Sequence, residues 1–75
     1  MNASEIEQLI EQHIPEASAQ VSGEDGRHFE AKVTSAAFKG LSRVKQQQWV
    51  YAALDDCIKS GQLHAIRLKT QISET

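Results

Sequence analysis

The sequence predicts a small α+β domain with the element order αββααβ, in which helices cover one face of a three-stranded mixed sheet. Apolar residues recur at helical spacing near residues 6–14 and 50–58. They alternate with polar residues near 17–22, 29–33 and 63–70, which is the spacing of half-buried strands. A strand that follows helices pairs most easily in parallel with an earlier strand, through a right-handed crossover.

The first helix is expected to begin at a capping box formed by Ser4 and Glu7. In such a box the serine oxygen accepts a hydrogen bond from a free amide of the first turn, and the glutamate reaches back to the cap. An apolar stripe follows, and Pro15 ends it because proline does not continue a helix. The members of this stripe are Ile6, Leu9, Ile10, His13 and Ile14.

The two alternating segments after Pro15 are expected to form a β-hairpin. Residues 17–22 carry alternate apolar side chains, and the alternation resumes at residues 29–33. Between them, Asp25-Gly26 suits a tight turn because glycine adopts a positive φ without strain. The pair is therefore expected to be antiparallel.

The rest of the chain is expected to form a brief helical piece within residues 34–42, a second long helix and a last strand. The long helix carries its stripe over residues 50–58, and Gly61 supplies a left-handed C-cap. The last strand covers residues 63–70, with alternate apolar side chains on one face. The expected core consists of Ile6, Leu9, Ile10, Phe29, Val33, Val50, Leu54, Ile58, Ile66 and Leu68.

Length and composition limit the classes of protein. A chain of 75 residues that is 40% hydrophobic and 24% charged fits one folded domain, expected to span residues 1–75. The single cysteine, Cys57, cannot form an internal disulfide, so a cytoplasmic protein is expected. No basic leader and no apolar run of about 20 residues is present, so neither a signal peptide nor a membrane span is expected.

Charge and motif content narrow the function further. The net charge of −2 argues against general affinity for nucleic acid, which usually needs an excess of clustered lysine and arginine. The sequence contains no visible nucleophile with a base, no carboxylate pair in one pocket and no phosphate-cradling loop. We therefore expect a protein that is not an enzyme.

Three stretches of the chain are distinctive in combination. They are Phe-Lys-Gly-Leu-Ser-Arg-Val-Lys at residues 38–45, Val50-Tyr51, and Leu-His-Ala-Ile-Arg-Leu-Lys at residues 63–69. Together they resemble the BolA family, most closely its IbaG-type branch, over nearly the whole chain. This resemblance implies a class II KH-like fold, which has the αββααβ order predicted from the periodicity.

The resemblance also implies a partner and a cofactor. Members of the family pair with monothiol glutaredoxins, and the heterodimer holds a [2Fe-2S] cluster with the glutaredoxin cysteine, glutathione and BolA side chains as ligands. Carried over to this sequence, the BolA ligands are His64, at the start of the last strand, and His28, in the loop of the hairpin. The isolated chain is then expected to hold no cofactor and to be a monomer or a weak homodimer.

The three histidines and the cysteine also have structural interpretations. Neutral imidazole is a good iron ligand. His64 also shares strand parity with Ile66, so its structural interpretation is a ring packed at the edge of the core, which is compatible with ligation. His28 follows a turn and is expected to adjust toward a partner. We assign a structural role to His13, on the apolar stripe of the first helix, and to Cys57, as a small inert apolar residue.

The alternative function is that of a nucleic-acid-binding KH-like regulator, with Lys39, Arg43 and Lys45 as the contacting residues. KH domains hold single strands against a GxxG loop between two helices. Here the corresponding loop is residues 40–43, and Arg43 replaces the second glycine. The structural interpretation is that Gly40 makes a turn, Ser42 caps the following helix and the charges are solvated.

Overall fold

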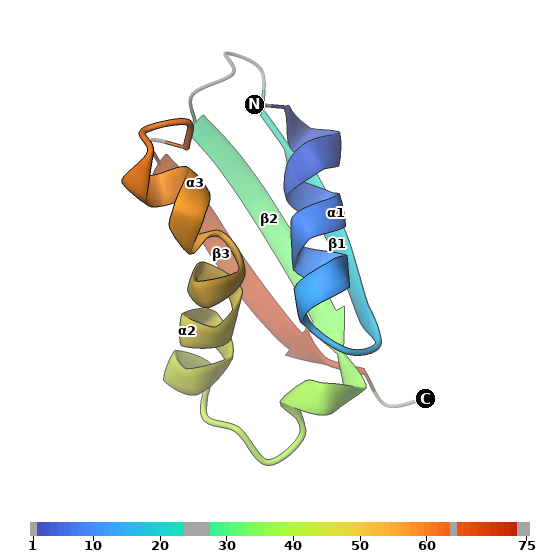
Figure 1. Cartoon of the computed structure of the whole chain (residues 1–75). Helices are drawn as coiled ribbons and strands as arrows, with labels where there is room; N and C mark the ends of the chain where they lie inside the picture. The colour runs from blue at the N-terminus through green and yellow to red at the C-terminus, as the bar shows by residue number, and fades with distance from the viewer. Residues whose placement is uncertain (1, 24–27, 64, 74–75) are drawn as a thin grey trace.

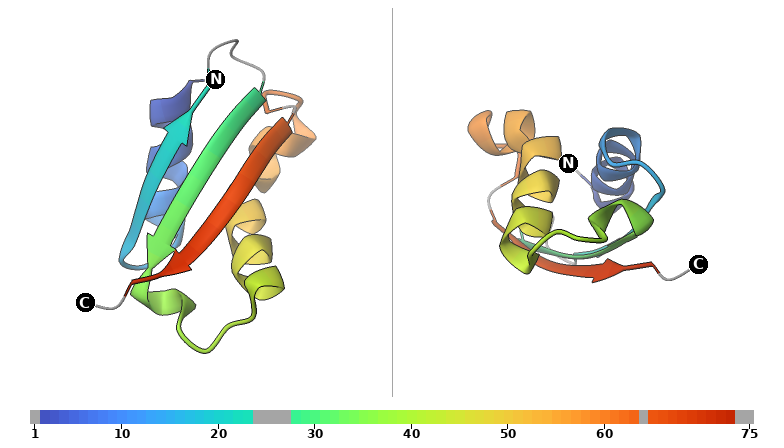
Figure 2. Two further views of the ribbon diagram at one scale, coloured as in Figure 1. Left: turned by 180° about the vertical axis from the view of Figure 1, so that it is seen from behind. Right: turned by 90° about the horizontal axis from the view of Figure 1, so that it is seen from below.

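The fold is a three-stranded sheet with every helix of the described residues on one face (Figures 1 and 2). The computed structural model describes residues 2–23, 28–63 and 65–73. Its elements are α1 (Ala3–His13), β1 (Ala17–Ser22), β2 (His28–Ser35), the 3-10 turn η1 (Ala36–Phe38), α2 (Arg43–Ala53), α3 (Asp55–Lys59) and β3 (Ala65–Ile72). The predicted α+β fold class is confirmed.

The sheet has the strand order β1-β2-β3, with β2 in the centre. β1 and β2 are antiparallel, from Ala17 opposite Ser35 to Ser22 opposite Glu30. β2 and β3 are parallel, as the crossover argument predicts, from His28 opposite Ala65 at one end to Ser35 opposite Ile72 at the other. The first turn of α1 lies at the His28 end of the sheet (Figure 1).

The hydrophobic core lies between the sheet and the helices. Of the predicted core residues, six are buried and three, Leu9, Ile66 and Leu68, are half-buried against them. The prediction that Ile58 belongs to the core is wrong, since this residue is 40% exposed. The buried apolar residues are Ile6, Ile10, Ile14, Ala19, Phe29, Ala31, Val33, Phe38, Val50, Leu54 and Leu63.

The long helix expected through residue 58 is interrupted at Leu54, which separates α2 from α3. Leu54 has φ −106° and ψ 6°, and its N–H donates to the carbonyl of Tyr51 rather than of Val50. The fully buried Leu54 side chain stays in the core while the chain changes direction. The apolar stripe therefore does not continue along one straight axis, which is why Ile58 faces outward.

Helix α1 begins two residues earlier than predicted. The capping box is formed by Asn2 and Glu5: the Glu5 N–H donates to Asn2 Oδ1 at 2.9 Å, and the Asn2 N–H donates to Glu5 Oε1 at 3.3 Å. Asparagine is as good an N-cap as serine, so the earlier box satisfies the first turn and Ser4 lies inside the helix. Glu7 is thus left for another contact.

Glu7 and Glu11 close the outer edge of β1. The Val21 N–H donates to Glu7 Oε2 at 2.8 Å, and the Ala19 N–H donates to Glu11 Oε2 at 3.0 Å. An edge strand otherwise presents unpaired amides that can pair with another chain. Carboxylates from the helix give these amides charge-assisted partners instead.

The buried polar side chains tie separate elements together. Ser35 Oγ donates to the Pro15 carbonyl at 2.6 Å and accepts from the Ala37 N–H, which caps η1. Gln46 Nε2 donates to the Leu41 carbonyl, and Gln46 Oε1 accepts from the Thr70 hydroxyl at 2.7 Å. These bonds fix α2 against β3.

No helix in the described part of the chain is long and apolar enough to cross a membrane.

Candidate metal centre

His28 is the first residue of β2 and is exposed to solvent. This corrects the expectation that it lies in the hairpin loop. The ladder between β1 and β2 reaches only Glu30, but the ladder between β2 and β3 continues to His28, which lies opposite Ala65. The strand therefore extends two residues beyond its pairing with β1, because β3 supplies the partner.

His64 falls outside the described residues, so its metal role and its strand parity stay predictions. Its two chain neighbours belong to the described residues. Leu63 is buried, and its N–H donates to the Cys57 carbonyl at 3.1 Å. Ala65 opens β3 opposite His28. His28 and Ala65, the residue that follows His64 in the chain, therefore lie opposite each other on adjacent strands at the same end of the sheet.

A shallow hollow surrounds His28, and a tight backbone contact borders it. Its lining residues are Ser22, Gly23, His28, Phe29, Glu30, Ala65, Ile66 and Arg67. A Cβ atom at Gly23 would lie 2.6 Å from Phe29 Cδ1 and 2.8 Å from the His28 carbonyl oxygen. Only glycine fits this close approach, so Gly23 is a positioning residue for His28. The sequence suggested only a turn there.

An apolar hollow adjoins the one around His28, between the helices and β3. It is lined by Tyr51, Ile58, Leu63, Ala65 and Ile66. Ala65 and Ile66 line both hollows, so the two are neighbours. Tyr51 is 42% exposed and Ile58 is 40% exposed, and both line this one hollow, where neighbouring exposed apolar side chains can mark an interaction site. This apolar surface escaped the sequence analysis because it depends on the break at Leu54.

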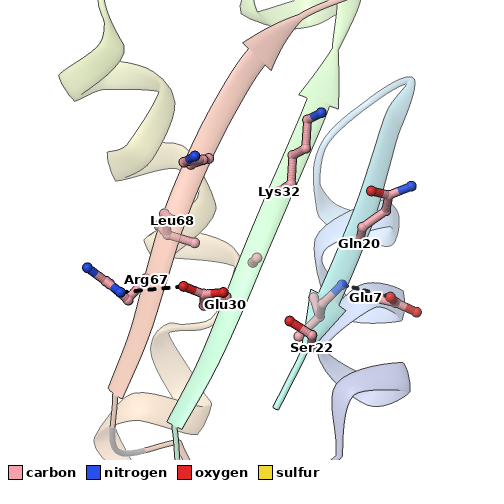
Figure 3. Close-up of a pocket in the computed structure, with 10 residues that line it drawn as sticks. Glu7, Gln20, Ser22, Glu30, Lys32, Arg67 and Leu68 are labelled. Atoms are coloured by element: carbon pink, nitrogen blue, oxygen red, sulfur yellow. Dashed lines mark hydrogen bonds and ion pairs between the residues drawn. The ribbon is translucent and has the colours of Figure 1, made fainter.

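Ion pairs near the two hollows are exposed. Arg67 and Glu30, opposite each other in the β2–β3 register, approach to 3.5 Å on the open face of the sheet (Figure 3). On α3, a hydrogen bond and the charge of Asp55, 2.9 Å from the ammonium group, raise the pKa of Lys59. Exposed pairs contribute little stability, so these residues mainly set local charge.

The other residues singled out from the sequence lie elsewhere. Cys57 is half-buried against the core. His13 is exposed rather than part of the packed stripe, because α1 ends there and Ile14 takes the buried position. Within residues 2–23, 28–63 and 65–73, no three His, Cys, Asp or Glu side chains gather into a group that could hold a metal ion.

The three candidate nucleic-acid residues, Lys39, Arg43 and Lys45, are all exposed. Gly40 has φ 85° and makes the turn before α2. Ser42 Oγ accepts from the Lys45 N–H at 3.2 Å, so Ser42 is the N-cap of α2. The structural interpretation of this loop is confirmed, and a nucleic-acid role stays a prediction.

Comparison with known proteins settles the family. The family model described as BolA-like protein matches residues 2–75. The chain belongs to the BolA family. The acid stress protein IbaG of Escherichia coli (strain K12) is 36% identical over 69 residues, which cover 92% of this chain and 81% of that protein. The similarity to the IbaG-type branch inferred from three motifs is thereby confirmed.

Two further relatives extend the comparison. The structure of a BolA homologue from Coxiella burnetii has a TM-score of 0.86 and 33% identity, covering 99% of this chain and 94% of that one. SufE-like protein 1 of Arabidopsis thaliana is 41% identical over 66 residues, which cover 85% of this chain but 18% of that protein. A domain of this family thus also occurs within a much longer chain.

Proposed function

We propose that this BolA-family protein is a non-enzymatic partner of a monothiol glutaredoxin in the cytoplasm, and that the two proteins share a [2Fe-2S] cluster in cluster trafficking or iron homeostasis. The observation that carries the proposal is the β2–β3 register, in which His28 lies opposite Ala65, the residue that follows His64. The register thus brings His28 to the residue that adjoins His64, and two imidazole ligands near each other would suit one iron atom.

The donor set suits a cluster held jointly with another molecule. His28 is exposed at the end of a strand, so a cluster carried by a partner can approach it from solvent. A [2Fe-2S] cluster takes four ligands, and histidine on one iron raises its reduction potential relative to cysteine. His28 and His64 would supply two ligands, and the glutaredoxin cysteine and glutathione would supply the others.

The apolar hollow supports a protein partner rather than a small chelator. Tyr51 and Ile58 are exposed side by side in one hollow, and grouped exposed apolar side chains mark sites of protein interaction. Since this hollow shares Ala65 and Ile66 with the hollow around His28, a protein that docks there reaches the candidate ligands. We expect the contact with glutaredoxin to bury both side chains.

The test is to reconstitute the protein with a monothiol glutaredoxin, glutathione, iron and sulfide under anaerobic conditions. The expected result is a brown heterodimer whose visible spectrum differs from that of the glutaredoxin alone. His64→Ala and His28→Ala should each bleach or alter this spectrum, whereas His28→Cys should keep a cluster of lower reduction potential. His13→Ala is the matched control, since His13 is exposed on α1, away from β3.

Two outcomes would contradict parts of the proposal. A heterodimer whose spectrum is unchanged in both histidine variants would remove the ligand assignment while keeping the partnership. Failure of the two proteins to associate, measured by size-exclusion chromatography with and without the cluster, would remove the partnership itself. Ile58→Asp should weaken association without changing either histidine, which separates docking from ligation.

A further inference from the structure

The open face of the sheet carries two neighbouring pairs of charged residues that differ in their charge match. Glu30 lies opposite Arg67, and these two form an ion pair. Two residues further along the same strands and on the same face, Lys32 lies opposite Lys69. Like charges directly opposite each other on neighbouring strands destabilise a sheet. The register thus holds one matched pair and one repulsive pair side by side.

A third cation joins the repulsive pair. Arg43, in the first turn of α2, lines one hollow together with Lys32 and Lys69. The other described lining residues are Gln47, Leu68, Thr70 and Gln71, and none of them is acidic. The hollow therefore concentrates positive charge in a protein whose net charge is −2.

These three cations make no ion pair within the described residues, and Glu30, which lines a neighbouring hollow with Lys32 and Lys69, is paired with Arg67. The side chains of Lys32, Arg43 and Lys69 are all exposed. The first turn of α2 contains no acidic residue, so the positive end of the helix dipole is not offset by a side chain there. Lys39, in the loop before α2, and Lys45, in the first turn of α2, do not line the hollow.

We propose that this hollow binds a phosphate group through Lys32, Lys69 and Arg43. A phosphate would lie between the two lysines, turn their mutual repulsion into shared attraction and accept hydrogen bonds from the guanidinium group. The amide side chains of Gln47 and Gln71 add neutral donors at the rim. The ligand is either a small phosphorylated molecule or the backbone of a nucleic acid, which offer the same phosphoryl oxygens.

The experiment is a titration at low ionic strength, followed through the backbone amide signals of residues 32, 43 and 69 by NMR. Inorganic pyrophosphate is the probe in one arm, and a short single-stranded oligothymidylate is the probe in the other. Tighter binding of pyrophosphate assigns the site to small phosphorylated molecules. Tighter binding of the oligonucleotide, falling steeply with salt, assigns it to nucleic acid.

Two variants of one residue make the test selective. Lys69→Gln should weaken binding about twofold to fivefold, as expected for one exposed charge contact. Lys69→Glu should weaken it further and also raise the thermal midpoint, because it gives Lys32 an opposite charge across the strands. Lys45→Gln, on α2 but outside the hollow, and Lys59→Gln, paired with Asp55 on α3, are the controls.

The proposal is overturned if neither probe shifts these signals, or if both controls weaken binding as much as Lys69→Gln does. It is also overturned if Lys69→Glu stabilises the fold but leaves binding intact, since the lysine pair would then be an unfavourable contact without a ligand. Loss of binding in the Lys69 variants alone, with the controls unchanged, supports it.

Discussion

Replacing Gly23 with alanine should displace the start of β2 and with it the candidate ligand His28. The added Cβ would lie 2.6 Å from Phe29 Cδ1, 2.8 Å from the His28 carbonyl oxygen and 2.9 Å from Phe29 Cε1. Ordinary contact begins at 3.4 Å, so the backbone or the ring must move by roughly 0.8 Å. Phe29 is only 3% exposed and packed in the core, so its ring has little room to yield.

The size of the effect follows from overpacking. Forcing extra atoms into a packed site costs about 1 to 3 kcal/mol. In a domain of this length each kcal/mol lowers the thermal midpoint by about 4 to 8 °C, so the Gly23→Ala protein should melt roughly 5 to 20 °C below wild type. The signals of His28 and Phe29 in an NMR spectrum should shift with it, because both residues touch the new methyl group.

Gly40→Ala provides the matched control for this prediction. Gly40 has φ 85° and nothing lies within 4 Å of an added Cβ, so alanine there suffers only backbone strain, about 1 to 2 kcal/mol. Its loop lies at the opposite end of the sheet from His28 (Figure 1), so the His28 signals should stay in place. A Gly23→Ala protein that melts within about 1 °C of wild type, with unchanged His28 signals, would refute the steric argument.

Three other variants test the packing and backbone geometry described above. The double variant Glu7→Ala, Glu11→Ala removes both carboxylates from the β1 edge and should lower the free energy of unfolding in urea by about 2 to 4 kcal/mol. It should also self-associate more at high concentration, and an unchanged urea midpoint would contradict the role of these carboxylates at the edge. Leu54→Ala should lower the free energy of unfolding by about 2 to 5 kcal/mol in the same assay, because the Leu54 side chain is fully buried. A smaller loss would show that the chain between α2 and α3 moves to fill the cavity. Glu16 has φ 56°, so Glu16→Asn should raise the thermal midpoint slightly, and a decrease would show that its side chain has another role.

Local patterns were enough to predict three strands and the parallel crossover, although the last strand lies at residues 65–72 rather than 63–70. The alternation at residues 17–22 and 29–33 survives in the structure, since the apolar members face the helices. The start of α1 was predicted wrongly at Ser4, because Asn2 and Glu5 have the same capping-box spacing two residues earlier and form the box in the structure. The break at Leu54 has no sequence signal, as neither glycine nor proline occurs in residues 43–60.

The candidate site was predicted in part. The motif resemblance supplied His28 and His64, but the position of His28 on a strand depends on the distant pairing with Ala65. The packing role of Gly23 was not predicted, because its contacts with Phe29 exist only in the folded chain. The Lys32–Lys69 pair likewise depends on a register between segments 37 residues apart, which no local pattern reports.

The way the chain is threaded through the sheet gives its two ends different surroundings. Ala3, at the start of α1, lies at the same end as His28, while Ile72 closes β3 at the other end (Figure 1). The eight residues of β3 separate the two ends by about 23 Å. A tag, dye or second domain joined after β3 therefore stays clear of the candidate metal centre, whereas one joined before α1 would crowd it. Fluorescent labels and affinity handles belong at the C-terminal end, and a bulky N-terminal fusion offers a simple steric block of the partner.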